Sequence, residues 1–298
     1  ESNGNYQQID GLIYKNSEGE VVQTKPRKVS KDLDYIPFPD YEGFGLNTYL
    51  DLQRPNDSLF LYPEDNPRMI PMSFSRSCPY SCTFCYQPTG QIYRKRSISN
   101  FFTELDLITN RYDVNLLAVY DDLFSVKRDR TIEFCERIKP YGIKWIAQMR
   151  VDMVDNELLE ILYDSGCYNI SYGIESMDET VLVNMKKKTK SYRVAEALEE
   201  TYQNKIGIQG NFIFGDSAET METANNTLDW WKKHKKYTLN LFPILTYPGS
   251  GLYIQAVQKG VITDEVKFLE DGCPLINVSK ISDDDFSQLV DTLEHHNT

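Results

Sequence analysis

The sequence has no apolar run near the roughly 20 residues that a membrane-spanning helix needs. Its first stretch, Glu1–Asp10, lacks the apolar core of a secretion signal. The sequence has few basic residues: 32 Lys and Arg, compared with 44 Asp and Glu, give a net charge of −12. We therefore expect no membrane span, and neither nucleic acid nor anionic lipid as the main partner, since both reward a basic surface.

The composition is otherwise that of an ordinary globular protein, 41% hydrophobic and 26% charged. A chain of 298 residues can bury a sizeable core. Its six cysteines do not form the pattern of a disulfide framework, because three of them fall within eight residues. We expect a cytoplasmic protein with one unusual cysteine cluster.

Short β-rich runs alternate with segments whose apolar residues recur at helical spacing. The predicted strands are Met69–Ser75, Leu116–Tyr120, Trp145–Met149, Asn169–Gly173, Gln209–Phe214 and Leu239–Leu245, and the predicted helices are Asn100–Thr109, Asp129–Ile138, Asp155–Tyr163, Tyr192–Tyr202 and Glu219–Trp231. This alternation implies right-handed βαβ crossovers and a parallel sheet. Six units are fewer than the eight of a full TIM barrel, so the sequence predicts an α/β fold, a partial (β/α)6 TIM-like barrel.

The first 66 residues follow a different pattern. Gly11–Tyr14 and Val21–Val22 flank Asn16–Gly19, which predicts a β-hairpin. Six prolines from Pro26 to Pro67 then break any long element. We expect residues 1–66 to form an N-terminal hairpin and linker segment, and residues 67–298 to form the barrel with a C-terminal extension.

Cys78, Cys82 and Cys85 follow the first predicted strand, at the end where barrel enzymes hold their chemistry. Their spacing lets one loop aim three sulfurs at a common point. Thiolates select iron–sulfur clusters, copper or zinc, and a four-iron cluster on three cysteines keeps one iron for a small molecule. A structural zinc site wants four ligands, and no histidine is near in sequence. A zinc-binding interaction module without turnover is the alternative outside the enzymes.

The pattern Cys78-x3-Cys82-x-Phe84-Cys85 resembles the signature of the radical S-adenosylmethionine (SAM) enzymes, including the aromatic residue before the last cysteine. The resemblance implies a [4Fe-4S] cluster on the three cysteines, with SAM chelating the open iron. It also implies that an electron from the cluster cleaves SAM to methionine and a 5′-deoxyadenosyl radical, which abstracts hydrogen from the substrate. Phe84 is then expected near the adenine of SAM.

Further residues at predicted strand ends fit this resemblance, which covers about residues 67–260. Asp121 and Asp122 stand where the family often has Gly-Gly-Glu and are expected at the SAM ammonium or the substrate, with a helix N-cap as the plain alternative. Arg150 suits the SAM carboxylate through its planar fork, with a surface ion pair as the alternative. Glu175, in a Gly-Ile-Glu-Ser segment, is expected at the ribose hydroxyls.

The segment from Asn211 to Gly215 resembles the Gly-x-Ile-x-Gly adenine contact of the family, with Asn211 in place of the first glycine. Ile213 and Gly215 are therefore expected near adenine. Glu219 is expected at the start of a helix, in a structural role.

Two other features are expected to be structural. The Lys186–Lys188 run is expected to be a solvated face. Cys135, Cys167 and Cys273 are expected to be small buried hydrophobes, although C-terminal cysteines in some radical enzymes bind further clusters or act on substrate.

Gly11–Tyr14 together with Asp32–Tyr41 resembles the linker that follows a cobalamin-binding domain in one large radical SAM subfamily. Such a doubly wound domain needs roughly 120 residues or more, which these 298 do not provide besides the barrel. Cobalamin is therefore expected only if an upstream domain is present.

The resulting expectation is a radical SAM enzyme that functionalises, with methylation as one form, a small-molecule or lipid-precursor substrate. A cobalamin-dependent methyltransferase follows if the upstream domain exists. Its electrons are expected from a reductant such as a flavodoxin or ferredoxin. The alternatives within the class are an RNA-modifying methylthiotransferase, which the charge of −12 disfavours, and a barrel that binds SAM without cleaving it.

Overall fold

The fold is built around one parallel sheet. The computed structural model describes residues 5–55, 62–87 and 90–297, and six strands form a sheet in the order β10-β9-β8-β7-β6-β3. They are β3 (Met69–Met72), β6 (Leu116–Val119), β7 (Lys144–Met149), β8 (Cys167–Glu175), β9 (Gly207–Phe214) and β10 (Thr238–Pro243). All neighbouring pairs are parallel, which confirms the predicted partial barrel. Strands β3 and β10 are the edges of this open barrel.

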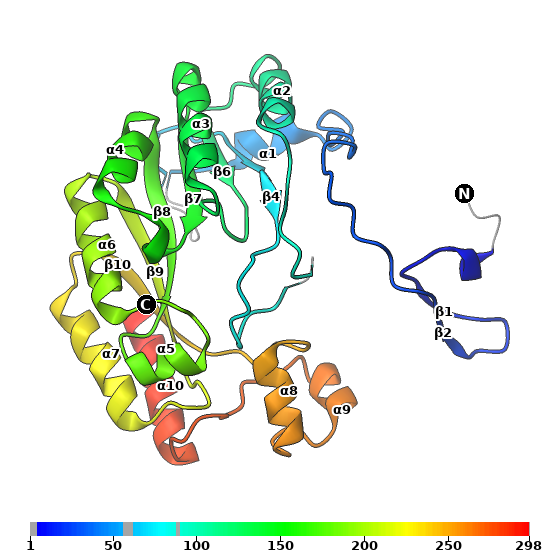
Figure 1. The fold of residues 1–298 in the computed structure, drawn as a ribbon, viewed down its shortest axis with the longest axis vertical. Coiled ribbons are helices and arrows are strands. Elements are labelled where there is room, and N and C mark those ends of the chain that lie inside the picture. Colours follow the sequence, from blue (N-terminus) through cyan, green and yellow to red (C-terminus); the bar gives the residue numbers. More distant parts are fainter. Residues whose placement is uncertain (1–4, 56–61, 88–89, 298) are drawn as a thin grey trace.

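Helices connect the strands and cover one face of the sheet. The predicted helices are present as α2 (Ile98–Thr109), α3 (Arg128–Ile138), α4 (Asn156–Asp164), α6 (Ser191–Gln203) and α7 (Met221–Lys233). Figure 1 shows α3, α4, α6 and α7 along one side of the strands. Asp155 accepts a hydrogen bond from the backbone N–H of Leu158 (2.9 Å) and caps α4, as predicted. Among the described residues, no helix is both long and apolar enough to cross a membrane.

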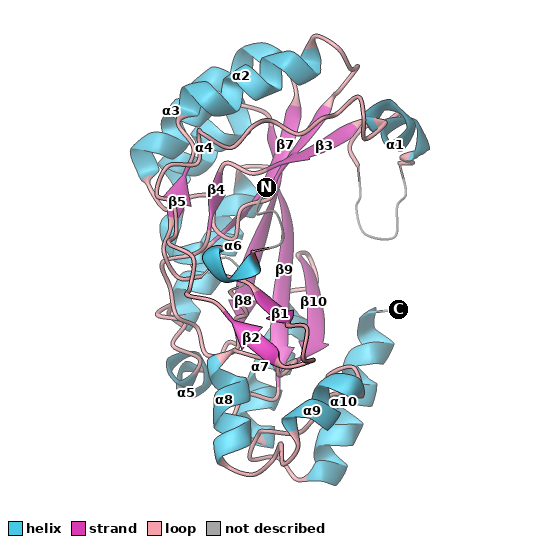
Figure 2. Cartoon of the chain, turned by 90° about the vertical axis from the view of Figure 1, so that its right-hand side faces the viewer, coloured by secondary structure: helices cyan, strands magenta, loops and turns pink. Residues whose placement is uncertain are grey.

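Several further elements were not predicted from the sequence. They are α1 (Leu46–Leu52), α5 (Glu179–Asn184), α8 (Gly251–Gln258), α9 (Glu265–Glu270), α10 (Asp283–Asn297) and the short 3₁₀ helices Tyr6–Gln8, Lys139–Tyr141 and Val151–Met153. Helix α10 packs against β10 and buries Phe286, Leu289 and Leu293. Figure 2 shows α8 and α9 beyond the ends of the strands, with the C-terminal end of α10 rising beside β10. The C-terminal extension is therefore part of the packed barrel.

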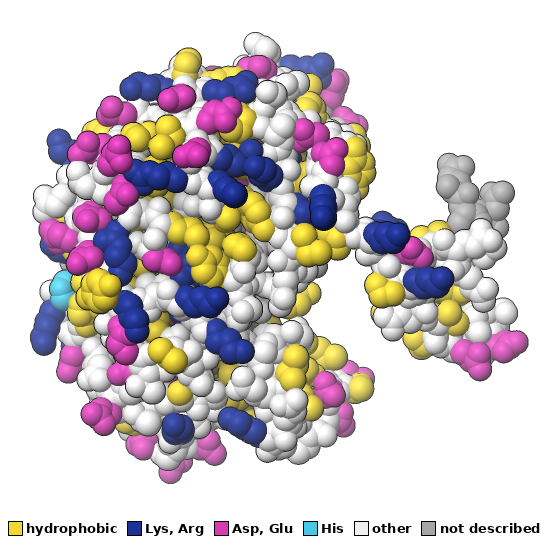
Figure 3. Space-filling view, viewed as in Figure 1, with side chains coloured by type: hydrophobic (Ala, Val, Ile, Leu, Met, Phe, Trp, Pro, Cys, Tyr) yellow, Lys and Arg dark blue, Asp and Glu magenta, His cyan; other side chains and the backbone are white. Residues whose placement is uncertain are grey.

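The N-terminal hairpin is confirmed. Strands β1 (Ile13–Lys15) and β2 (Val21–Gln23) pair antiparallel, with Tyr14 opposite Val22. The Asn16 side chain accepts from the backbone N–H groups of residues 18 and 20 (3.0 and 2.9 Å) and closes the turn. Figure 3 shows the hairpin standing apart from the main body. The first four residues of the polar N-terminal stretch lie outside the described residues, and the boundary between residues 66 and 67 stays a prediction.

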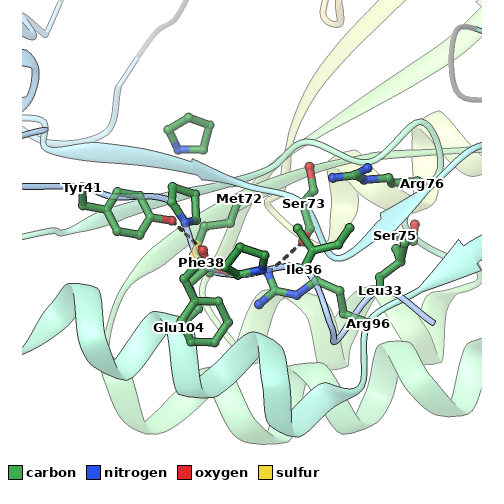
Figure 4. A pocket seen from close by; sticks show the side chains of 13 residues that line it. Leu33, Ile36, Phe38, Tyr41, Met72, Ser73, Ser75, Arg76, Arg96 and Glu104 are labelled. Carbon is green, nitrogen blue, oxygen red and sulfur yellow. Dashed lines mark hydrogen bonds and ion pairs between the residues drawn. The ribbon is translucent and has the colours of Figure 1, made fainter. Parts of the chain in front are cut away.

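The linker packs against the first barrel strand around a buried ion pair. Glu104 of α2 pairs with Arg96, and the Tyr41 hydroxyl donates to Glu104 Oε1 (2.7 Å). Burial and the nearby Glu104 raise the pKa of Tyr41 above its usual range. Arg96 also donates to the backbone carbonyl of Ser73 (3.3 Å). These side chains line a cavity of about 240 Å³ whose walls include none of the three clustered cysteines (Figure 4).

An aromatic core fixes the base of the cysteine loop. The buried rings of Phe74, Phe101, Phe124, Phe134 and Trp145 contact one another with centroids 4.9 to 5.8 Å apart. Packed aromatic rings of this kind contribute strongly to core stability. Because Phe74 stands four residues before the first clustered cysteine, the core anchors the chain where the loop begins.

A buried acidic pair, Asp216 and Glu219, follows β9. Glu219 Oε2 accepts from the backbone N–H of Gly215, and within the described residues one oxygen of each carboxylate has no hydrogen-bond partner. Burial, and then the nearby Asp216, raise the pKa of Glu219 to about 8. Helix α7 begins after Thr220, whose hydroxyl accepts from the backbone N–H of Thr223 (3.3 Å). Helix α7 therefore starts two residues after Glu219, which corrects the predicted helix start. The structural role of Glu219 stays a prediction.

This buried acid predicts a pH-dependent stability. Between about pH 4.5 and 8 the folded chain holds a proton on Glu219 that the unfolded chain has released. The free energy of unfolding therefore falls as pH rises through that window. Glu219→Gln cannot ionise at this position. We expect its advantage over the parent in free energy of unfolding, measured with urea, to grow by roughly 2 kcal/mol as pH rises from about 6 to 8. Glu222→Gln, on the exposed first turn of α7, is the matched control, and a pH-independent difference for Glu219→Gln would contradict the prediction.

Candidate functional site

The clustered cysteines lie on one loop at the C-terminal end of β3. The chain leaves β3 through β4 (Ser75–Arg76), which pairs antiparallel with β5 (Arg94–Lys95), and the loop connects these two short strands. Cys78, Cys82 and Cys85 are free thiols, each half-buried. The backbone N–H of Cys85 donates to the carbonyl of Cys82 (3.2 Å) and closes a turn. The loop is therefore at the strand end that the sequence predicts.

The arrangement of the thiols is not that of a single-ion site. No three His, Cys, Asp or Glu side chains in the described part of the chain are grouped to hold one metal ion. The expectation that the three sulfurs aim at a common point stays a prediction. A four-iron cluster needs a wider arrangement of thiols, because each cysteine binds a different iron and the sulfurs surround the cluster. The cluster assignment stays a prediction.

The surroundings of the thiols combine burial with positive charge. Burial raises the pKa of all three, that of Cys85 to about 11. The charge of Lys187 lowers the pKa at each thiol, and that of Arg150 does so at Cys78 and Cys82. The thiolate is the form that binds metal. The two cations therefore oppose the effect of burial without reversing it, and the pKa of each thiol stays above its ordinary value.

The acidic pair after β6 holds the segment that leads into the cysteine loop. The buried Asp121 accepts from the backbone N–H groups of Phe74 and Ser75 (2.7 and 2.8 Å) and from the Ser75 hydroxyl (2.6 Å). Asp122 accepts from the backbone N–H of Ser77 (2.9 Å), which has a φ of 69°. Burial raises the pKa of Asp121 to about 6. These contacts favour a positioning role for Asp121 over the predicted cofactor contact, and neither acid caps α3.

The hydrogen bonds from Phe74 and Ser75 to Asp121 predict different outcomes for two substitutions of Asp121. Asp121→Ala leaves the buried N–H groups of Phe74 and Ser75 without an acceptor, which costs roughly 2 kcal/mol of unfolding free energy. Asp121→Asn retains a carbonyl oxygen for both groups, so we expect it to keep most of the stability. Thermal unfolding and bound iron after anaerobic reconstitution measure the two effects. Equal losses of stability in both variants would contradict this role of the Asp121 carboxylate.

Arg150 follows β7 and lies under the cysteine loop. Its side chain is 6% exposed, and its Nε and Nη2 donate to the two carboxylate oxygens of Asp152 (2.8 and 3.0 Å). Nη2 also donates to the Lys187 carbonyl (2.6 Å) and the Thr189 hydroxyl (2.8 Å). The guanidinium lies 3.9 Å from the ring centroid of Tyr80. Arg150 is therefore not in a surface ion pair, and Nη1 has no hydrogen-bond partner within the described residues.

Glu175 ends β8 at a β-bulge and forms a buried ion pair. The register with β9 shifts between Gly173 and Glu175, and Glu175 has a φ of 70°. Its Oε1 accepts from Lys187 Nζ at 2.6 Å, and each side chain is 8% exposed. A Cβ on Gly173 would lie 2.6 Å from that oxygen, so a side chain at this position would displace the carboxylate. The predicted solvated face is thus wrong for Lys187, while its two lysine neighbours are exposed.

The residues expected near adenine gather around one apolar cluster. Phe84 and Ile213 both pack against Val181, Met185, Ile244 and Leu252. Gly215 has a φ of 108°, and a Cβ there would lie 2.9 Å from the Phe286 ring and 3.1 Å from Ile244. The structure thus brings Phe84 and Ile213 together and places Gly215 beside the same cluster. What they bind stays a prediction.

Sequence reasoning missed Tyr80, Asp152 and Thr189 as members of this site. For Tyr80, which contacts Arg150, the only sign in the sequence was its position within the cysteine motif. Asp152 and Thr189 hydrogen-bond to Arg150 because the folded chain brings them together. Of the remaining cysteines, Cys135 and Cys167 are buried as predicted, whereas Cys273 is half-buried.

Several solved structures share this fold, and the following two are among them. The first is the radical S-adenosylmethionine methyltransferase TsrM from Kitasatospora setae, with cobalamin and a [4Fe-4S] cluster bound (TM-score 0.66, 15% identity, 84% of this chain and 49% of that one). The second is the cobalamin-dependent S-adenosylmethionine radical enzyme OxsB with aqua-cobalamin and S-adenosylmethionine bound (TM-score 0.63, 20% identity, 92% of this chain and 38% of that one). At such identities the likeness concerns the fold alone.

Curated relatives are more similar in sequence. An uncharacterised methyltransferase of Pyrococcus horikoshii is 27% identical over 259 residues, covering 85% of this chain and 53% of the relative. An anaerobic magnesium-protoporphyrin IX monomethyl ester cyclase of Rubrivivax gelatinosus is 26% identical over 265 residues, covering 87% of this chain and 46% of the relative. The chain spans about half the length of these proteins.

The family is settled by a match to the Radical SAM superfamily over residues 72–230, more than half of the chain. The matched region runs from the end of β3 into α7 and contains the cysteine loop, Arg150 and Glu175. The chain belongs to the radical SAM superfamily.

Proposed function

We propose that Cys78, Cys82 and Cys85 hold a [4Fe-4S] cluster whose fourth iron binds SAM. The observation that carries the proposal is the set of three half-buried free thiols at the carboxyl edge of a parallel sheet, beside the buried cations Arg150 and Lys187. When bound, such a cluster supplies the electron that cleaves SAM to methionine and a 5′-deoxyadenosyl radical. The protein contributes binding, orientation and exclusion of water.

The side chains around the loop suit the parts of SAM. Arg150 Nη1 is directed to the methionine carboxylate, because the other donors of this fork are held by the protein. Glu175 Oε2 is assigned to the ribose hydroxyls, since Oε1 is paired with Lys187. The apolar cluster at Phe84 and Ile213, with Gly215 beside it, is assigned to adenine. The exposed Asp122, whose Oδ2 accepts from the loop, is assigned to the SAM ammonium.

The reaction is radical functionalisation, in the form of methyl transfer, of a small molecule or lipid precursor. The name of the methyltransferase relative supports this assignment. A flavodoxin or ferredoxin would supply the electron, and the free cysteines suit the reducing cytoplasm. Cobalamin, which both structural neighbours hold, enters the proposal only through a module outside these 298 residues.

Anaerobic reconstitution tests the proposal. The chain is reconstituted with iron and sulfide, mixed with SAM and dithionite, and assayed for 5′-deoxyadenosine and methionine by mass spectrometry. We expect a brown protein that forms both products. A colourless protein with bound zinc would favour an interaction module, and a cluster without 5′-deoxyadenosine would mean SAM binding without cleavage. Either result contradicts the proposal.

A further inference from the structure

The connection between α5 and α6, residues 185–190, lies against the cysteine loop. The backbone N–H of Thr83 donates to the carbonyl of Met185 (3.0 Å), and Cys82 Sγ lies 3.9 Å from the carbonyl oxygen of Lys186. The guanidinium of Arg150 donates to the carbonyl of Lys187 (2.6 Å). This connection is therefore tied both to the cysteine loop and to the end of β7.

The backbone of this connection is bent so that its central lysine lies inside. Lys186 and Lys188 have φ values of 53° and 58°, a left-handed region that side-chain-bearing residues disfavour. Both are exposed, whereas Lys187 between them is 6% exposed. Disfavoured backbone persists only where surrounding contacts hold it, and it concentrates at functional sites. The strain here serves to bury one positive charge.

The ammonium of Lys187 lies beside Glu175, and the backbone of Lys187 belongs to the segment that contacts the cysteine loop. Lys187 Nζ pairs with Glu175 Oε1 at 2.6 Å, and Glu175 itself has a φ of 70°. The carbonyl oxygen of the neighbouring Lys186 lies 3.9 Å from Cys82 Sγ, and the positive charge of Lys187 lowers the pKa of the Cys78, Cys82 and Cys85 thiols against the larger effect of burial. A cluster on three thiolates becomes more negative when it is reduced. A fixed cation nearby stabilises that added negative charge, and the buried position of Lys187 limits the screening of its charge by water.

We propose that Lys187 is a positioning residue of the cluster site that fixes Glu175 in the orientation facing SAM and stabilises the reduced cluster. This inference rests on the proposed function and adds to it a residue outside the cysteine, Glu175 and Arg150 motifs. A lysine buried only to neutralise Glu175 would alter stability and leave the reduction potential unchanged. The potential is therefore the discriminating measurement.

Three variants of the reconstituted protein test the proposal. Lys187→Met removes the charge, Lys187→Arg keeps it, and Lys188→Met is the matched control at an exposed neighbour with the same backbone region. Midpoint potential is measured by redox titration followed by electron paramagnetic resonance, and SAM affinity by calorimetry with the oxidised protein. We expect Lys187→Met to have a more negative potential and about tenfold weaker SAM binding. Lys187→Arg keeps the parent potential, and Lys188→Met changes neither quantity.

A folded, iron-loaded Lys187→Met with the parent potential and SAM affinity would overturn the proposal. If this variant does not fold because Glu175 is left unpaired, Glu175→Gln is compared with the double variant Glu175→Gln/Lys187→Met, which differs only in the charge at residue 187. A more negative potential in the double variant supports the proposal, and equal potentials overturn it. A parent chain that loads no cluster would instead contradict the proposed function, so the two failures are distinguishable.

Discussion

Cys82→Ala is expected to abolish iron loading. The three cysteines share one loop, and each is assigned to a different iron, so loss of one thiolate removes a third of the protein ligands of the cluster. Alanine at a half-buried loop position leaves the packed core intact, and the fold is expected to persist. Iron and acid-labile sulfide per chain, with the visible absorption of the reconstituted protein, measure the effect. We expect both contents to fall to background.

Cys273→Ala is the matched control for this prediction. Cys273 is also a half-buried free thiol, but it packs beside Tyr253 and Phe268 of α8 and α9. The same substitution there should leave iron content unchanged. Full four-iron content in Cys82→Ala would refute the ligand assignment, and with it the proposed function. Loss of iron in Cys273→Ala would mean that this thiol also serves a cluster.

The barrel could be predicted from the sequence because its strands are short apolar runs that recur at regular intervals. The same reasoning did not find α5, since six residues such as Glu179–Asn184 are too few to show a helical period. Helix α10 did carry a signal. Three acidic residues open it, and Phe286, Leu289 and Leu293 follow at helical spacing to pack on β10. The many acidic residues of α10 made its short apolar face hard to recognise in the sequence.

The candidate site was only partly predictable, because a residue type does not say which way its side chain faces. The cysteines were found from spacing alone. Asp121 was expected at the SAM ammonium or the substrate, and the residues around it carried no sign that Oδ1 accepts from backbone N–H groups 46 and 47 residues away. Lys187 looked like part of a solvated run, but it is buried between two neighbours with left-handed backbone. Contacts made by strained backbone leave no pattern in the sequence.

Arg150→Ala is expected to lose both stability and SAM binding. The substitution removes the two-point contact with Asp152, two further hydrogen bonds and the stacking on Tyr80. Breaking a nearly buried ion pair costs roughly 3 kcal/mol of unfolding free energy. Arg128→Ala is the control, because Arg128 also pairs with two carboxylates, those of Asp155 and Glu157, but is 37% exposed. Its loss should cost at most about 1 kcal/mol.

Arg150→Lys separates the charge of this residue from its shape. Lysine keeps a cation beside the thiols but cannot hold Asp152 through two donors and present a third to a carboxylate. We therefore expect iron loading near that of the parent, together with SAM binding weakened about tenfold, equivalent to roughly 1.4 kcal/mol. Iron analysis and calorimetric titration with SAM measure the two quantities. If Arg150→Lys bound SAM as tightly as the parent, the fork would serve only to hold Asp152, Lys187 and Thr189 together, and the SAM carboxylate would have to find another partner.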